Sequence, residues 1–250
     1  MTDPISAQGA ASHNDFSAPI EFDKTSTRIT VPAYLQKIYW WAYVHPNAVK
    51  IFERDWLVNL ILFGNYTALC DAALGEIGKD AKGATLQVAC AYGDLTPRLR
   101  ERIADDGKLH VIDVLPIQLQ NLKRKLPPDM RVSLIQRDSS ALGFADASYE
   151  RALVFFLLHE QPENVRRRTL AEACRVVKPG GKVVVVDYHR PDNWNPVRHP
   201  LRALLRRLEP YADDLWNNEI ENYLPEDVKF SGIRKETYFG GLYQKVVLTV

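Results

Sequence analysis

Residues 85–96 (TLQVACAYGDLT) combine a short apolar run, a turn and the start of a helix, an arrangement that can hold a nucleotide. In an α/β protein such a turn is rich in glycine, because glycine lets the backbone approach the ligand closely. Here Gln87, Ala89 and Ala91 stand where an acid and two glycines are typical, and only Gly93 remains. The turn therefore predicts a nucleotide site that is either lost or rebuilt for different chemistry.

Acidic side chains follow the next two apolar runs. Asp113, followed by Val114, could accept hydrogen bonds from both ribose hydroxyls of an adenosine, or it could cap the following helix. Asp138 and Ser139 could hold an adenine amino group, or they could belong to a plain polar loop. A glycine-containing turn, these two acids and the later KPGG motif occur in the order of a nucleotide-binding α/β domain. The combination therefore favours a nucleotide site.

A second group of polar residues follows the fourth and fifth apolar runs. His159 is a candidate catalytic residue or a loop histidine, and Asp187 could instead be a cap. Carboxylates and imidazole suit hard divalent ions such as manganese, so Glu160, Asp187 and His189 form a candidate metal site, which Asp94 could join.

The turn itself supplies a further catalytic candidate. Tyr92 is expected to act as a general base or to contact the substrate as part of a lid. The residues expected to bind the cofactor are Gln87, Ala89, Cys90, Ala91, Tyr92, Gly93, Asp113, Val114, Asp138 and Ser139.

Alternating strands and helices must position these residues. Apolar runs predict strands at 84–90, 108–113, 131–136, 149–158 and 182–188, and helical spacing predicts helices at 96–104, 116–126, 162–177 and 198–209. That alternation, with fully apolar runs such as VVVV, is typical of a parallel sheet covered by helices on both faces. The last two extended stretches are expected to pair as a hairpin through Gly240 and Gly241.

Composition divides the chain into three parts. Residues 1–30 are polar and small and predict a flexible tail, and residues 83–250 carry the α/β pattern. Residues 31–82 are helical and rich in aromatic residues such as Trp40, Trp41 and Trp56, so they predict a lid over the sheet or a membrane-facing segment.

The overall composition excludes several classes of function. The net charge of +1 gives no general attraction to nucleic acid, and no apolar run is long enough to cross a bilayer. The three cysteines lack metal-type spacing and suit a reducing, cytoplasmic setting.

The order of motifs over residues 83–250 resembles the class I S-adenosylmethionine-dependent methyltransferases. The segment from ALGFADASYERALVFFLLHEQPE to VVKPGGKVVVVDY is similar to their ubiquinone and menaquinone C-methyltransferase branch. The resemblance implies a Rossmann-like α/β fold with a seven-stranded, mostly parallel sheet, helices on both faces and a last strand inserted antiparallel. It also implies that S-adenosylmethionine lies across the turn, Asp113 and Asp138.

Three segments are similar to a narrower family, the rhodoquinone-biosynthesis (RquA) proteins. These segments are VACAYGDLT, LLHEQP and the aromatic segment ITVPAYLQKIYWWAYVHPNAVKIFERDW. This resemblance implies conversion of ubiquinone to rhodoquinone, with S-adenosylmethionine as the amino donor and manganese assisting. A neutral Gln87 in place of an acid would then favour an uncharged, nucleophilic amine, although relaxed selection on the turn explains it equally well. A conventional quinone C- or O-methyltransferase and a non-catalytic binding module remain the alternatives.

A membrane-soluble substrate such as ubiquinone requires contact with a lipid surface. In RHPLRALLRRLEP, one face carries Leu201, Leu204, Leu205 and Leu208, and the arginines 198, 202, 206 and 207 supply positive charge. That pattern is typical of an interfacial helix on anionic lipid. The sequence therefore predicts a cytoplasmic protein that is peripheral on the cytoplasmic face of the inner membrane.

Overall fold

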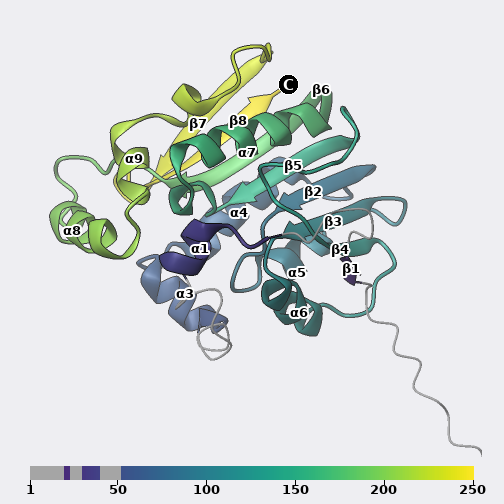
Figure 1. The fold of residues 1–250 in the computed structure, drawn as a ribbon, viewed down its shortest axis with the longest axis horizontal. Coiled ribbons are helices and arrows are strands. Elements are labelled where there is room, and N and C mark those ends of the chain that lie inside the picture. The colour runs from purple at the N-terminus through teal and green to yellow at the C-terminus, as the bar shows by residue number, and fades with distance from the viewer. Residues whose placement is uncertain (1–19, 23–29, 40–51) are drawn as a thin grey trace, which may run out of the picture.

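The computed structural model describes residues 20–22, 30–39 and 52–250, and its centre is a sheet in the order β1-β4-β3-β2-β5-β6-β8-β7, with helices on both faces (Figure 1). The strands are β1 (Ile20–Phe22), β2 (Ala84–Val88), β3 (Lys108–Asp113), β4 (Val132–Gln136), β5 (Tyr149–Phe155), β6 (Val177–Tyr188), β7 (Gly232–Tyr238) and β8 (Tyr243–Thr249). The helices are α1 (Ala33–Lys37), α3 (Asp55–Ile61), α4 (Tyr66–Ile77), α5 (Leu95–Arg100), α6 (Pro116–Lys125), α7 (Glu163–Val176), α8 (Arg198–Leu208), α9 (Ala212–Asn217) and the 3-10 helices η2 (Leu158–Glu160) and η3 (Ile220–Tyr223).

The expected seven-stranded, mostly parallel sheet is confirmed. Its seven strands lie side by side in the order β4-β3-β2-β5-β6-β8-β7. Strands β2 to β6 pair in parallel, whereas β8 pairs antiparallel with both β6 and β7. The hairpin between β7 and β8 turns at Gly240 and Gly241, as expected, and both glycines have positive φ. Strand β1 adds an eighth strand beside β4, from within the segment that was predicted to be a tail.

The KPGG motif, whose proline and glycines are expected to separate a helix from the following strand, has a different place in the structure. The KPGG motif (178–181) lies inside β6 rather than before it, because the pairing of β5 with β6 shifts register between Tyr149 and Arg151. Gly180 has φ +79°, and its N–H donates to the Val250 carbonyl. The irregular backbone therefore keeps its hydrogen bonds within the sheet.

The core lies on both faces of the sheet. One cluster packs α4 and α8 against the sheet through residues such as Leu69, Leu74, Leu201 and Leu205, and the other packs α7 against the opposite face. Helix α4 was grouped with the N-terminal segment, but its buried residues pack on the sheet. The core of the α/β domain therefore begins before residue 83.

The N-terminal segment is described only in part. Helix α1 packs Leu35 and Tyr39 against Leu115, which follows β3. Trp40 and Trp41 lie outside the described residues. No helix in the described part of the chain has the length and apolar character needed to span a bilayer.

A single buried arginine fixes the loop that follows β5. Arg166 of α7 is fully buried, and its guanidinium donates to the carbonyls of Leu158, Gln161 and Tyr211 at 2.9–3.0 Å. The guanidinium also lies 4.7 Å from the centre of the Tyr223 ring. Residues 158–161 are therefore held by backbone bonds to a charged donor, which are stronger than neutral hydrogen bonds.

We predict that Arg166→Met lowers the free energy of unfolding by about 3 kcal/mol, because three buried carbonyls lose their donor. The matched variant is Arg168→Met, two residues along the same helix, where the side chain is exposed; it should change the free energy by no more than about 0.5 kcal/mol. Urea unfolding of both variants measures the difference. Equal stabilities would show that Arg166 does not hold the loop.

Candidate functional site

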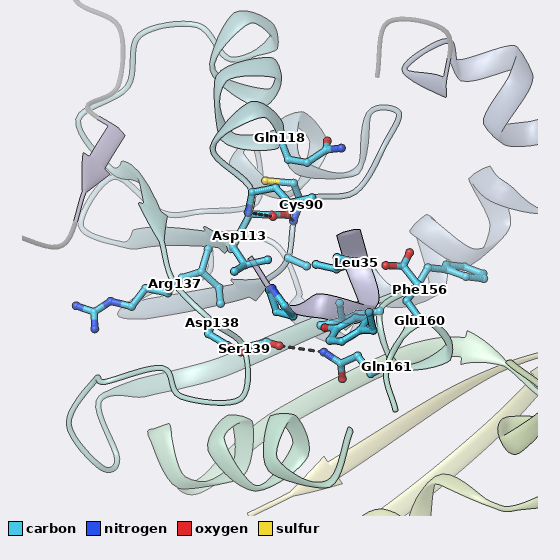
Figure 2. Close-up of a pocket in the computed structure, with 17 residues that line it drawn as sticks. Leu35, Cys90, Asp113, Gln118, Arg137, Asp138, Ser139, Phe156, Glu160 and Gln161 are labelled. Carbon is cyan, nitrogen blue, oxygen red and sulfur yellow. Dashed lines mark hydrogen bonds between the residues drawn. The ribbon is translucent and has the colours of Figure 1, made fainter. Parts of the chain in front are cut away.

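A first cavity lies at the carboxyl ends of β2, β3 and β4, under helix α1. Its empty space is about 590 Å³, part of it open to solvent, which is within the usual range of small-molecule sites. Cys90 and Asp113 lie on one side of this cavity, and Ser139 and Gln161 lie on the other, whereas Arg137 extends away from it (Figure 2). The sequence-predicted residues that line it are Ala89, Cys90, Asp113, Val114, Asp138 and Ser139.

Asp113 joins the turns that follow β2 and β3. Its carboxylate accepts hydrogen bonds from the backbone N–H of Cys90 at 2.9 Å and of Leu115 at 2.8 Å. Burial raises the pKa of Asp113 to about 6, although both N–H donors oppose the shift. Asp113 is thus a buried acceptor that ties the two turns together at the cavity wall.

Asp138 and Ser139 form the opposite wall. One Asp138 oxygen accepts from the N–H and the hydroxyl of Ser140, both at 2.8 Å, so the loop after β4 has a defined shape. The Ser139 hydroxyl accepts from the Gln161 side-chain amide at 3.0 Å. Polar groups from two separate loops therefore converge on this wall of the cavity.

The turn after β2 adopts a glycine-like backbone although it lacks most of the glycines. Ala89 has φ +72°, a conformation that costs an L-residue about 1–2 kcal/mol. Gln87 is fully buried, and its side chain accepts from Thr96 Oγ1 at 2.9 Å and donates to the Ala89 carbonyl at 3.0 Å. Gln87 lines neither cavity, and its side chain instead holds the shape of the turn.

The remaining glycine makes room for a tyrosine. A Cβ at Gly93 would collide with the Tyr66 side chain, whose hydroxyl donates to the Tyr92 carbonyl and accepts from the Leu95 N–H at 3.0 Å. Helix α4 therefore holds the second half of the turn through one hydroxyl group.

A second cavity adjoins the first and has apolar walls. About 810 Å³ of empty space, part of it open to solvent, is lined by Phe52, Val58, Ile61, Leu62, Tyr66, Cys90, Ala91, Tyr92, Phe155, Phe156, Tyr188 and three polar residues, His159, Glu160 and Glu209. Cys90, Phe156 and Glu160 line both cavities. Phe156 has φ +51°, so the backbone is strained where the two cavities meet.

His159 is held by one carboxylate and faced by two more. Its Nδ1 lies 2.8 Å from Asp187 Oδ1, while its Nε2 lies 3.4 Å from Glu209 Oε2 and 3.8 Å from Glu160 Oε1. Burial alone would lower the pKa of His159, but the three carboxylates outweigh burial and raise it to about 9. The neighbouring carboxylates therefore favour the protonated, positively charged form of His159.

The other reactive side chains of the turn keep their protons. Burial raises the pKa of the Tyr92 hydroxyl and of the Cys90 thiol well above their usual ranges. Tyr92 accepts a hydrogen bond from the Gln118 amide at 2.8 Å. These features favour Tyr92 as part of the wall rather than as a general base.

The predicted metal ligands are not brought together. Asp187 is fully buried, and its oxygens accept from His159 and from the N–H groups of Leu158 and Tyr188. His189 follows the end of β6, where its Nδ1 lies 2.7 Å from the Gly241 carbonyl oxygen. Within residues 20–22, 30–39 and 52–250, no three His, Cys, Asp or Glu side chains are arranged to hold a metal ion.

Several lining residues had no signal in the sequence. Glu209 directly follows α8, and Tyr34 comes from the N-terminal segment, so both are distant in sequence from the turn. Their role depends on how α1 and α8 pack, and no motif reports that packing. Phe156 could have been selected, because it ends a strand whose carboxyl end faces the site.

The comparisons with known proteins agree on the fold class. Residues 85–181 match the family described as "Methyltransferase domain". The 2-phytyl-1,4-naphtoquinone methyltransferase of Trichormus variabilis is 26% identical over 194 residues, which cover 74% of this chain and 84% of that protein. The demethylmenaquinone methyltransferase of Shouchella clausii is 29% identical over 184 residues, covering 72% of this chain and 77% of that protein.

Solved structures show the same architecture. A SAM-dependent methyltransferase from Aquifex aeolicus superposes with a TM-score of 0.53 at 18% identity, over 82% of this chain and 99% of that one. Phosphoethanolamine N-methyltransferase 2 of Haemonchus contortus, solved with S-adenosyl-L-methionine, gives a TM-score of 0.63 at 13% identity, over 88% of this chain and 60% of that one.

We predict that Ala89→Gly raises the free energy of unfolding by about 1 kcal/mol, because glycine adopts positive φ without strain. Ala91→Gly, two residues along the same turn, should instead lower it by about 0.5 kcal/mol, because Ala91 has no positive φ to relieve. Thermal and urea unfolding test the pair. A loss of stability in Ala89→Gly would contradict the strained geometry.

The sheet order, the site at the carboxyl ends of the strands and the sequence matches all agree. The chain has the Rossmann-like class I methyltransferase fold, and its residues 85–181 match the methyltransferase domain family.

Proposed function

We propose that the protein uses S-adenosylmethionine to modify a quinone, and that the reaction converts ubiquinone to rhodoquinone. The observation that carries this proposal is the contact of His159 with Asp187 at the wall of an aromatic cavity that adjoins the first cavity. The facing carboxylates favour the positively charged form of this imidazole by raising its pKa. A protonated imidazole can donate a hydrogen bond to a quinone carbonyl, which makes the ring more electrophilic.

The first cavity fits S-adenosylmethionine by the chemistry of its walls. Asp113 supplies an acceptor for ribose hydroxyls, and Asp138 with Ser139 supplies polar groups for an adenine. The cavity meets the second one at Cys90, Phe156 and Glu160, so the methionine end of the ligand would lie nearest the quinone.

The second cavity fits a quinone head group. Its aromatic walls suit a flat apolar ring, and its polar groups gather at His159. The two relatives named above carry quinone substrates in their names, which supports a quinone here.

Amination suits these residues better than methylation does. In the proposed reaction the α-amine of S-adenosylmethionine attacks the ring, and a ring methoxy group leaves as methanol. The quinone ring of this adduct then takes two electrons and two protons from the N–Cα unit, which becomes an imine. Water hydrolyses the imine, so the N–Cα bond breaks to release an α-keto acid and the ring keeps the amino group as an aminohydroquinone, the reduced form of rhodoquinone. Attack by an amine needs an electrophilic ring, which His159 promotes by hydrogen bonding to the carbonyl oxygen. Methylation instead needs a nucleophilic ring and a base, and a histidine with a pKa of about 9 is a poor base at neutral pH.

A conventional quinone C- or O-methyltransferase is the second candidate, favoured by the naphthoquinone and menaquinone enzymes among the relatives. A non-catalytic binding module on the same fold is the third.

No step is assigned to manganese, because the predicted ligands Glu160, Asp187 and His189 do not converge. We also propose that the protein works on the cytoplasmic face of the inner membrane, where its substrate dissolves.

The reaction is tested with S-adenosylmethionine labelled separately at the methyl carbon and at the α-nitrogen. The purified protein is incubated with each form and a short-chain ubiquinone, with and without manganese, and the quinone is examined by mass spectrometry. We expect nitrogen label in the ring. Methyl label would identify the conventional methyltransferase, and label from neither form would favour the binding module.

We predict that turnover falls as the pH rises through about 9, where His159 loses its proton. Glu209→Gln removes one of the facing carboxylates, so the pKa of His159 falls. The alkaline limb of the curve of turnover against pH should therefore move down by about one pH unit. Glu163→Gln, an exposed glutamate on α7, is the control and should leave the limb in place. If the alkaline limb of this curve did not move in Glu209→Gln, His159 would not be the group that controls turnover.

A further inference from the structure

We infer that one apolar surface beside the second cavity docks on an anionic lipid bilayer. The surface consists of eight exposed side chains, which we call the apolar rim: Trp56, Leu60, Ile61, Phe63, Trp194, Leu204, Leu208 and Phe239. This inference rests on the proposed function in one respect, because a quinone with a lipid tail would have to enter the cavity from a bilayer.

Exposed apolar side chains are concentrated at the rim. Within the described part of the chain, ten large apolar side chains are exposed, and eight of them belong to the rim. Leu60 is 64% exposed, Trp56 is 61% exposed and Trp194 is 73% exposed. The other two, Met130 and Ile233, come from the loop before β4 and from β7. Clustered exposure of this kind marks an interaction site, whereas single exposed residues do not.

Contacts join the segments that carry the rim. The ring of Phe63, after α3, stacks on the ring of Phe239 in the β7–β8 turn with centroids 5.8 Å apart. A Cβ at Gly240 in that turn would lie 2.8 Å from the Trp194 ring, and Asn195 donates to the Phe239 carbonyl at 2.7 Å. Helix α8 begins three residues after Asn195. The rim therefore spans neighbouring elements.

The rim lies at the opening of the second cavity. Ile61 lines that cavity and is also 44% exposed, so it stands at the boundary between the cavity and solvent. Val58 and Leu62, on the inward side of the same segment, line the cavity wall. At the other end of the rim, Leu208 precedes Glu209, which faces His159. A molecule that leaves the docked surface would thus enter the cavity directly.

Helix α8 contributes differently from the sequence-based expectation. Leu201 and Leu205 are buried in the core, so only Leu204 and Leu208 of the predicted apolar face remain exposed. Arg202 and Arg206 form ion pairs with Asp213. The lipid-facing surface is therefore the wider rim, and not the amphipathic face of α8 alone.

Positive charge around the rim favours an anionic bilayer over an apolar protein partner. Helix α8 carries four arginines and no acidic residue, and Arg207 is exposed on it. Arg54 next to α3 and Arg190 before Trp194 are also exposed. Tryptophans flanked by arginines are typical of side chains that lie at the level of lipid headgroups.

Flotation with vesicles of phosphatidylglycerol and phosphatidylcholine tests the inference, in the absence of S-adenosylmethionine and quinone. We expect the combined variant Trp56→Ser, Leu60→Ser and Trp194→Ser to bind the vesicles about tenfold or more weakly. The control variant, Met130→Ser with Ile233→Ser, removes exposed apolar side chains elsewhere and should bind like the unaltered protein. Arg207→Glu should weaken binding to these vesicles but not to pure phosphatidylcholine.

Equal vesicle binding by the rim variant and the unaltered protein would overturn the inference. It would also be overturned if the rim variant dissociated a dimer in the absence of lipid, as measured by analytical ultracentrifugation, because the rim would then bind a second copy of the chain. None of the three substituted residues lines either cavity. The rim variant should therefore retain turnover of a water-soluble short-chain quinone, so failure of the proposed reaction is seen separately from failure of docking.

Discussion

The contact between the buried carboxylate of Asp187 and His159 is the constraint on which the site depends. Asp187 is fully buried near the end of β6, and it accepts from the imidazole and from the backbone N–H groups of residues 158 and 188. It therefore favours the charged form of His159 and fixes the orientation of the ring, whose Nε2 lies beside Glu209 and Glu160 at the wall of the aromatic cavity. Removing one partner of a buried pair is strongly destabilising, so His159 and Asp187 each depend on the other.

The surrounding fold supports this contact from both sides. Arg166 holds the carbonyls of the loop that contains His159, while the Tyr66 hydroxyl holds the turn on the far side of the cavity. The strained backbones of Ala89 and Phe156 lie at the tips of β2 and β5, where the two cavities approach each other. Strain that persists at such positions is typical of functional sites, because the neighbouring structure has to maintain it. The strained backbone thus lies at the junction between the first cavity and the aromatic second cavity.

Much of the fold and part of the site could be predicted from local sequence. Strand β3 was expected at its observed bounds, and Asp113 and Asp138 were found because acids at strand ends have a fixed place in this topology. The hydrogen bonds of the Gln87 side chain with Thr96 and Ala89 could not be predicted, because they depend on the shape of the turn. Glu209 was missed and His189 was misplaced because each depends on how a distant element, α8 or the β7–β8 turn, packs against the end of the sheet. Spacing along the chain carries no record of such long-range packing.

The proposed reaction requires His159 to be positively charged in the second cavity at neutral pH. The most direct measurement is a titration of the imidazole by nuclear magnetic resonance, with the protein labelled on histidine and the His159 signal assigned through a His159→Gln variant. We predict a pKa of about 9 for His159, so its signal should be that of an imidazolium throughout the neutral range. A pKa at or below the ordinary histidine value of about 6.5 would contradict it, because His159 would then be neutral and suited to act as a base.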